Sequence, residues 1–464
     1  MKYAKFNYLM VFLFALSCKS PSTENDAKIK LITLDPGHFH AALVQKSMYP
    51  DVDSTVYVYA AAGKDLDQHL EKIEGYNHAA ENPTHWKEEV YRGKDFLQRM
   101  IADKKGNVVV IAGNNHFKTA YIDAAVKGGF NVLADKPMAI DAANFELLKT
   151  AFSMAADKKL LLYDIMTERS EITNILQREL AAIPEIFGSL QKGSPQQPAV
   201  EMESIHYFYK YVSGKILTRP SWFMDTSQQG EGIADVAVHL VDLVQWACFP
   251  DQVIRYEKDI QLNSASRWPT AITLSQFNAI TKSNGFPDYL KKDVKDTLLN
   301  VFANGEINYK LRDVYVKVRA LWDYKAKAGG DSHYAVFRGT KADLVIRQGA
   351  DQDFKPSLYI LPSVSPANLF AYEQALNDKI NVVKARYPGI ELKKIDKGWE
   401  VLIPEQYKNG HEAHFAQVTT RFLAYLKNGN MPAWEVPNML AKYYTTTQAL
   451  SLAIKEGELK KNGK

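Results

Sequence analysis

The stretch VVVIAGNNHFKTAYIDAAVKGGFNVLADKP, residues 108–137, contains a strand, a helix and a second strand. Its opening Val/Ile run is typical of a parallel strand that is covered on both faces. The segment HFKTAYIDAAVKGG has helical spacing and ends on Gly128-Gly129, and FNVLADKP is a strand that Pro137 ends. Two strands joined by a helix imply a right-handed crossover and a parallel sheet.

The same alternation extends over residues 28–166. Further strands are expected in KIKLITL (28–34), STVYVYAA (54–61) and KLLLYDI (159–165), with a helix over 141–158. The long polar stretch 63–96 is expected to hold a helix and a surface excursion. The pattern predicts a Rossmann-like, doubly wound parallel sheet, which binds ligands at the carboxyl ends of its strands. The segments expected at those ends are 35–40, 113–116, 135–137 and 163–164.

The strand–helix alternation stops after Thr167, where predicted helices are followed by several β-rich runs. We expect residues 167–464 to form a C-terminal α+β domain with a large, mostly antiparallel open sheet, so the whole chain is of the α/β class. The net charge of +4 is small for 464 residues, and no basic block occurs. The composition therefore gives no support for nucleic-acid binding.

Residues 1–27 have the pattern of a signal and tether. A cationic start, MKYAK, precedes the apolar run YLMVFLFAL, which is too short to span a bilayer, and ALSC follows. This pattern resembles a bacterial lipoprotein signal, with Cys18 as the lipidated residue. We expect an exported protein that is anchored at the cell envelope through Cys18. A plain secretory signal is the alternative.

A second informative stretch, SWFMDTSQQGEGIADVAVHLVDLVQWA, covers residues 221–247. Asp235, His239 and Asp242 follow one another at i, i+4 and i+7, which places them on one face of an otherwise apolar helix. Three ionisable groups on such a helix need a reason. A His–Asp structural pair and a metal site are the alternatives to a catalytic group.

Together these motifs resemble the Gfo/Idh/MocA family of dehydrogenases. Its E-K-P motif corresponds to Asp135-Lys136-Pro137, its D-x-x-x-H-x-x-D helix to Asp235, His239 and Asp242, and its I-x-G-T-x-G-x-L pattern to VFRGTKADLVI at 336–346. The resemblance covers roughly residues 28–348. It implies an N-terminal Rossmann domain, a C-terminal α/β domain with a large sheet, and a carbohydrate-like substrate.

The resemblance also implies roles for individual residues. Lys136, Asp235 and His239 would be catalytic, and Arg169 and Trp222 are candidates for substrate binding. The residues expected to bind the cofactor are Gly37, His38, Phe39, His40, Asn114, Asn115, His116, Asp135, Lys136 and Pro137.

The first turn departs from the family, because Gly37-His38-Phe39-His40 stands where G-x-G-x-x-G is expected. No acidic residue ends the second strand, where Tyr59 to Ala62 stand, although Asp65 is near. We expect NAD rather than NADP, because no arginine awaits a 2′-phosphate there. His38 and His40 also form an H-x-H pair that could begin a metal site in a barrel hydrolase. The strand count and the Asp135-Lys136-Pro137 motif do not support a barrel, so we expect no metal.

The resulting hypothesis is an exported NAD-dependent oxidoreductase that acts on a secondary hydroxyl of a sugar or glycoside. An exported enzyme meets no maintained pool of free NAD, so the cofactor would have to be tightly held. One alternative is NAD-dependent glycoside cleavage by oxidation, elimination and re-reduction. Another is a non-catalytic glycan-binding lipoprotein with a degenerate dehydrogenase site. We also expect a homo-oligomer.

Overall fold

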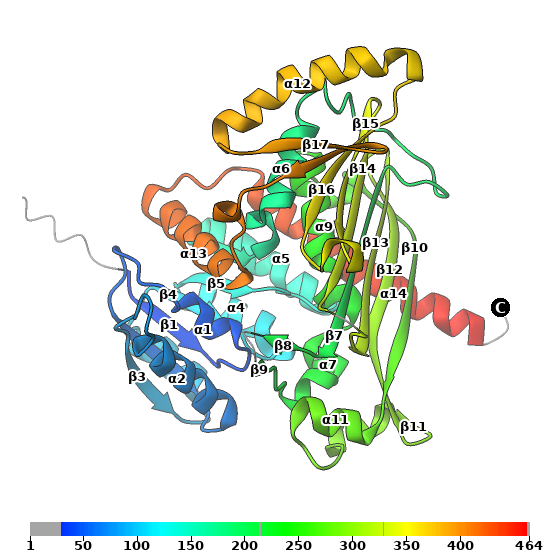
Figure 1. The fold of residues 1–464 in the computed structure, drawn as a ribbon. Coiled ribbons are helices and arrows are strands. Elements are labelled where there is room, and N and C mark those ends of the chain that lie inside the picture. Colours follow the sequence, from blue (N-terminus) through cyan, green and yellow to red (C-terminus); the bar gives the residue numbers. More distant parts are fainter. Residues whose placement is uncertain (1–28, 213–214, 328, 462–464) are drawn as a thin grey trace, which may run out of the picture.

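The computed structural model describes residues 29–212, 215–327 and 329–461 (Figure 1). The predicted leader, including Cys18, lies outside these residues. No helix in the described part of the chain is both long enough and apolar enough to cross a membrane.

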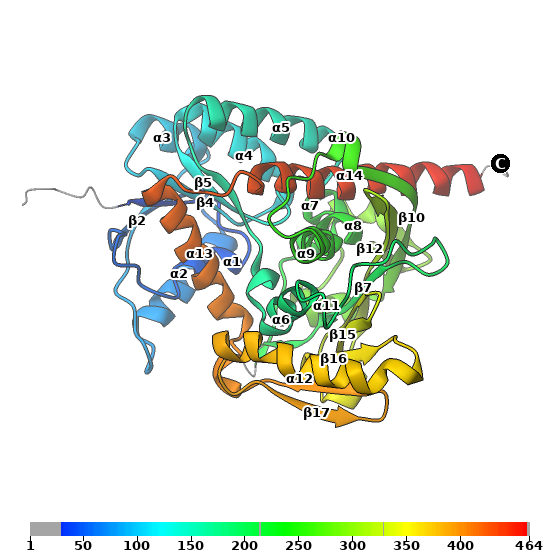
Figure 2. The same ribbon diagram turned by 90° about the horizontal axis from the view of Figure 1, so that it is seen from above.

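The N-terminal domain is built on a six-stranded parallel sheet in the order β3-β2-β1-β4-β5-β6. Its strands are β1 (Leu31–Leu34), β2 (Thr55–Ala60), β3 (Lys87–Arg92), β4 (Val108–Ile111), β5 (Asn131–Asp135) and β6 (Leu162–Ile165). Its helices are α1 (His40–Val44), α2 (Lys64–Asn77), α3 (Phe96–Asp103), α4 (Asn115–Gly128) and α5 (Ala142–Asp157). Helices α4 and α5 cover one face of the sheet, and α1 and α2 cover the other (Figure 2). The predicted doubly wound fold is confirmed.

One strand of this sheet was missed by the sequence analysis. β3 has the sequence KEEVYR and lies at the edge, beside β2, inside the stretch that we expected to hold only a helix and a surface excursion. All six of its residues are exposed or half-buried, because a neighbour covers it on one side only. An edge strand of this kind lacks the apolar run that made the central strands recognisable.

The C-terminal domain has a large mixed sheet in the order β10-β12-β13-β7-β14-β15-β16-β18-β17, with β11 paired to β12. Among the described strands of this sheet, only the neighbours β13 and β7 run parallel, with Val316 beside Val200 at one end of the pair. The strands are β7 (Val200–Tyr209), β10 (Ile260–Ile272), β11 (Val294–Lys295), β12 (Leu298–Leu311), β13 (Val314–Lys325), β14 (Ser332–Arg338), β15 (Ala342–Gln348), β16 (Ser357–Pro362), β17 (Glu391–Ile395) and β18 (Gly398–Leu402). A separate hairpin joins β8 (Tyr211–Val212) to β9 (Lys215–Ile216). The predicted large, mostly antiparallel sheet is therefore confirmed.

One face of the large sheet packs against helices, so buried residues alternate along β12 and β13 as expected for a sheet with one covered face. The helices of this half are α6 (Ile172–Ala181), α7 (Thr226–Gln229), α8 (Gly232–Asp235), α9 (Ala237–Cys248), α10 (Tyr256–Asp259), α11 (Leu274–Thr281), α12 (Leu369–Arg386), α13 (His411–Asn428) and α14 (Glu435–Lys461). Helix α9 lies at the centre of the molecule, beside the sheet (Figure 2). The single helix that we expected to carry Asp235, His239 and Asp242 is two helices, because the chain turns at Val236 between α8 and α9.

The last two helices join the two halves. Phe415 and Phe422 of α13 and Tyr443 of α14 belong to the apolar core of the N-terminal domain, while Ala449 and Leu450 of α14 belong to the core of the large sheet. Figure 2 shows α14 running from one half to the other. The segment that we placed wholly in the second domain therefore completes both cores.

Candidate active site

A cavity of about 440 Å³ lies between the carboxyl edge of the parallel sheet and the large sheet. The turn after β1, the turn after β5, helix α9 and strand β7 all contribute to its walls. Six of the eleven histidines in the chain line this one cavity. They are His38, His40, His206, His239, His333 and His411. The cavity is thus rich in imidazoles, which serve in proteins as acid–base groups and as metal ligands.

Lys136, Asp235 and His239 meet at this cavity. Lys136 follows β5, and its Nζ donates to the backbone carbonyl of Asp235 at 2.8 Å and to Asp235 Oδ1 at 3.0 Å. An ammonium has three N–H donors, so one donor of Lys136 remains for a ligand. His239 lies in the first turn of α9, and its buried Nδ1 has no hydrogen-bond partner among the described residues. Burial and the charge of Lys136 lower the pKa of His239 well below its usual value, which keeps the imidazole neutral and able to accept a proton.

The turns after β1 and β4 are pressed together at the same edge. A Cβ added to Gly113 would lie 2.3 Å from the carbonyl oxygen of Asp35 and 3.1 Å from the amide nitrogen of Gly37. A Cβ on Gly37 would lie 3.2 Å from Asp65 Oδ2. Asp35 itself has a φ of +46°, the conformation that glycine adopts most readily. These bare backbone turns fit a dinucleotide, whose pyrophosphate requires close approach to the main chain.

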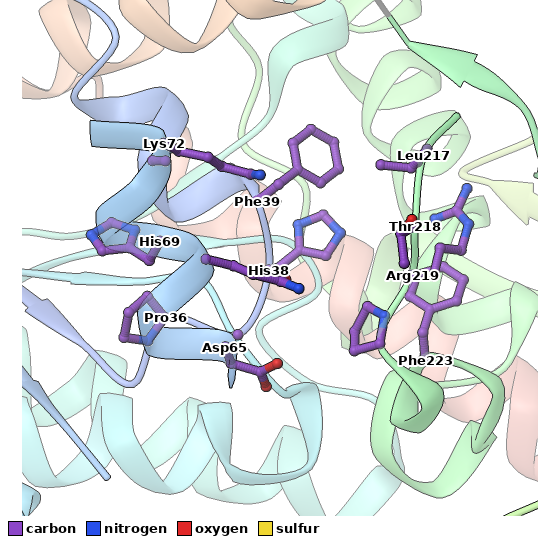
Figure 3. A pocket seen from close by; sticks show the side chains of 14 residues that line it. Pro36, His38, Phe39, Asp65, His69, Lys72, Leu217, Thr218, Arg219 and Phe223 are labelled. Carbon is purple, nitrogen blue, oxygen red and sulfur yellow. The ribbon is translucent and has the colours of Figure 1, made fainter. Parts of the chain in front are cut away.

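A smaller cavity, of about 60 Å³, adjoins this turn. Figure 3 shows Lys72 and His69 of α2 on one side and His38 in the middle; on the other side are Leu217, Thr218, Arg219 and Phe223. Asp65, at the start of α2, accepts a hydrogen bond from the indole Nε1 of Trp222 at 3.1 Å. β2 itself ends without an acidic residue, but Asp65 of the next helix, α2, places a carboxylate beside the turn after β1.

His38, His40 and Asp135 form a compact cluster behind the turn. His40 Nδ1 lies 2.9 Å and His38 Nδ1 lies 3.9 Å from Asp135 Oδ2. Burial lowers the pKa of both histidines well below the usual value. The imidazole of His40, buried at the start of α1, thus reaches Asp135 at the end of β5.

The opposite wall of the cavity carries a second polar group that the sequence analysis did not identify. His206 Nδ1 lies 3.0 Å and Lys210 Nζ lies 2.7 Å from Asp331 Oδ2, and Ser204 and His333 share a hydrogen bond of 2.8 Å. Ser204 and His206 are two residues apart on β7, so they point to one face of the sheet, and Lys210 follows the end of the strand at the same even spacing. That spacing of two was visible in ESIHYFYKYV and could have indicated a polar wall.

Family models match most of the chain. "Oxidoreductase family, NAD-binding Rossmann fold" matches residues 63–163, and "Putative oxidoreductase C terminal domain" matches residues 176–454. A crystal structure described as a putative oxidoreductase from Parabacteroides merdae ATCC 43184 is 55% identical, with a TM-score of 0.91 over 92% of this chain and 98% of that one. The chain belongs to the Gfo/Idh/MocA oxidoreductase family.

More distant structures share the fold of this Gfo/Idh/MocA oxidoreductase. A levoglucosan dehydrogenase, solved with NADH and L-sorbose, is 12% identical with a TM-score of 0.58 over 92% of this chain and 97% of that one. A biliverdin reductase from Synechocystis sp. PCC 6803, solved with biliverdin and NADP+, is 11% identical with a TM-score of 0.54 over 91% of this chain and 98% of that one. Curated proteins provide no match. The Rossmann fold of the family binds NAD or NADP, and the neighbours include complexes with each.

Three predicted cofactor residues of this family member have other partners. Asn114 Nδ2 donates to Gln228 Oε1 at 2.8 Å, Asn115 Nδ2 donates to the carbonyl of Gln229 at 2.7 Å, and His116 Nδ1 lies 3.1 Å from the carbonyl of Ser227. The three side chains therefore hold α7 against the start of α4. Phe39 lines both cavities, and Pro137 is buried directly after Lys136.

The two predicted substrate residues do not line the large cavity. Arg169 lies in the interior, where its Nε and Nη2 donate to Asp242 at 2.6 Å each and its Nη1 donates to Glu435 at 2.9 Å. Lys442 Nζ also lies 2.7 Å from both Asp242 and Asp164. Arg169 therefore belongs to a buried ion-pair network, and the substrate role expected for it stays a prediction. Trp222 lies beside the first turn instead, on Asp65.

Proposed function

We propose that the protein oxidises or reduces a secondary hydroxyl of a sugar or glycoside, with a tightly held NAD. One observation carries the proposal: Lys136, Asp235 and His239 come from both domains and converge on one cavity at the carboxyl edge of a dinucleotide-binding sheet. The levoglucosan dehydrogenase that shares the fold was solved with a sugar and NADH, which supports the choice of substrate class. The cavity also presents Trp322, an aromatic wall suited to the apolar face of a sugar ring.

Gly37, Gly113 and Asp65 would hold the dinucleotide, which supplies the hydride transfer when bound. Asp65 supports NAD over NADP, because a carboxylate beside the turn repels a 2′-phosphate.

In the oxidation direction, the neutral imidazole of His239 takes the proton of the reacting hydroxyl. The free N–H of Lys136 donates to the same oxygen and stabilises its developing negative charge. Asp235 binds Lys136 through two acceptors, so it positions the ammonium and leaves His239 to the substrate.

The first test is to denature purified protein and identify released nucleotide by absorbance and mass. We expect about one NAD(H) per chain. The second test measures nucleotide content and turnover of a sugar panel for Lys136→Met, His239→Ala and the double variant. Each single change is expected to lower turnover by roughly 10²–10⁴-fold while the nucleotide stays bound. The double variant should be little worse than the slower single one, because both groups act on one oxygen.

His78→Ala serves as the control, because His78 is exposed on the surface after α2 and does not line either cavity. Its turnover should equal that of the wild type. Normal turnover by His239→Ala with NAD still bound would show that α9 is not catalytic. Protein that never holds a nucleotide, even after reconstitution, would favour a glycan-binding lipoprotein.

A second candidate is glycoside cleavage by oxidation, elimination and re-reduction. Its support is the number of acid–base groups in the cavity, which exceeds what alcohol oxidation alone requires. Glu168 is among them, and burial together with the charge of Glu171 raises its pKa to about 7. In such a cycle one base removes the proton next to the transient ketone and an acid protonates the leaving oxygen. Release of the aglycone in D₂O, with deuterium in the product and no net change of NAD, would distinguish this reaction from simple oxidation.

Export and anchoring through Cys18 remain part of the proposal, supported by the sequence of residues 1–27. An exported enzyme could still use NAD if the nucleotide stays bound and is regenerated in the active site.

A further inference from the structure

We propose that His38, His40 and Asp135 bind a divalent transition metal whose free coordination positions take oxygen atoms of the ligand in the large cavity. The inference goes beyond the proposed hydride transfer and does not depend on it. It revises the expectation, drawn from the sequence, that no metal is bound.

The ligand atoms are already gathered. One nitrogen from each of His38 and His40 and one oxygen of Asp135 lie within 4.8 Å of one another. Zinc–ligand distances of about 2.0–2.2 Å require ligand atoms about 3–4 Å apart, so a small rotation of one ring suffices. His38 is the ligand best able to move, because its side chain is 16% exposed while that of Asp135 is 5% exposed.

An unused acceptor points to a cation as well. Asp135 Oδ1 is buried and has no hydrogen-bond partner among the described residues. A buried carboxylate oxygen without a partner is costly, and a cation would satisfy it. The 2.9 Å contact between His40 Nδ1 and Asp135 Oδ2 needs a proton between the two atoms, and a metal ion would take the place of that proton.

Positive charges near the cluster do not fill this role. Lys136 directs its ammonium to Asp235, and the buried Lys118 donates to the carbonyl oxygen of Lys136 at 3.3 Å. Lys118 is close enough to Asp135 to interact with its charge, yet no hydrogen bond joins the two in the described structure. Among the described residues, Asp135 Oδ2 therefore has a hydrogen bond with His40 and lies within ion-pair distance of His38, while Oδ1 is left over.

The composition and openness of the cluster indicate the class of ion and its task. Two imidazoles and one carboxylate suit zinc, iron and related ions rather than magnesium or calcium. Three protein ligands leave at least one position open, as in catalytic metal sites. His38 and His40 line the large cavity together with Lys136 and His239, so the open positions face the same space as the proposed acid–base groups. A hydroxyl or keto oxygen of the cavity ligand is the fitting occupant.

The test measures metal content by elemental analysis on full-length protein without a histidine tag. About one zinc, iron or manganese per chain is expected in the wild type. His40→Ala and Asp135→Asn should each weaken binding by more than the roughly 10–100-fold that loss of an outer-shell partner costs. His69→Ala is the matched control, because His69 is a buried histidine of the same domain outside the cluster, and it should retain the metal.

His38→Gln guards against loss of folding, because it changes the most exposed ligand; circular dichroism checks each variant. Titration with Co²⁺ gives an independent readout, since its visible absorption should appear in the wild type and in His69→Ala and weaken in the three cluster variants. A wild type that takes up none of the ions, or folded cluster variants that bind as tightly as the wild type, would overturn the proposal. Nucleotide released from the same samples is measured separately, so NAD without metal refutes this inference and leaves the proposed function standing.

Discussion

Replacing Asp242 by Asn is expected to destabilise the protein by roughly 3–5 kcal/mol, the usual cost of removing one partner from a buried ion pair. The side chain of Asp242 is 1% exposed, and that of Arg169, which donates twice to it, is 3% exposed. Lys442 Nζ, which is fully buried, also lies 2.7 Å from Asp242. The variant would leave two buried cations short of one negative charge. Glu435 and Asp164 retain contacts with them, which places the expected cost near the lower end of the range.

The assay is reversible unfolding in denaturant, followed by circular dichroism and compared with a thermal scan. An unfolding entropy of about 2.1 cal/mol/K per residue gives roughly 1 kcal/mol/K for a chain of this size, so Tm should fall by about 3–5 °C. Asp313→Asn is the control, because Asp313 pairs with Lys192 at the surface, where the side chains are 63% and 75% exposed. That change should cost less than about 1 kcal/mol. Equal effects of the two substitutions would refute the role assigned to the buried network.

The sign of the pH dependence provides a second check on Asp242. Arg169 and Lys442 outweigh burial and lower the pKa of this carboxyl, so its contribution is present at neutral pH. That contribution declines as the pH falls below about 3.9, the value in an unfolded chain, towards the lower value in the fold. The stability difference between wild type and Asp242→Asn should therefore be constant from pH 5 to 7 and shrink in acid.

Three further predictions concern the first turn and the leader. Gly113→Ala should destabilise the protein by roughly 1–3 kcal/mol and weaken nucleotide binding, because its Cβ would lie 2.3 Å from the carbonyl oxygen of Asp35. Gly63→Ala is the control: no atom lies within 4 Å of its Cβ, so the unfolding free energy should change by less than about 0.5 kcal/mol. Asp65→Ser should raise the affinity for NADP relative to NAD by about tenfold or more, measured by titration of nucleotide-free protein; an unchanged ratio would remove Asp65 from cofactor selection. Labelled palmitate should enter the wild type but not Cys18→Ser, and equal labelling would exclude the anchor.

The central strands could be predicted from the sequence because burial on both faces demands apolar runs. Val108 to Ile111 is an example, with all four residues buried between layers of helices. Lys136 and His239 were identified by resemblance, and the fold explains why they meet. Lys136 follows a strand of the parallel sheet, and His239 lies in the first turn of the helix beside the large sheet.

The partners of Arg169 and of His38 could not be predicted from the sequence, for one physical reason. Arg169 follows β6 at the ligand-binding edge, which suggested a substrate contact, yet its partners Asp242 and Glu435 are 73 and 266 positions away. Local pattern does not reveal which carboxylates a buried arginine will meet. His38 and Asp135 form one cluster for the same reason, since only the order of the strands brings the ends of β1 and β5 to one place.

The path of α13 and α14 also bears on when the N-terminal domain can fold during synthesis. The N-terminal domain draws Phe415, Phe422 and Tyr443 into its core, so that core stays incomplete until synthesis has passed these positions. Domains usually fold as they leave the ribosome, N-terminal first, but here we expect residues 29–166 to complete their core only after the C-terminal helices have been made. Residues 29–166 made alone would present to water the apolar surface that these helices cover. Such a delay would suit the export that we propose, because a secretion channel threads unfolded chain.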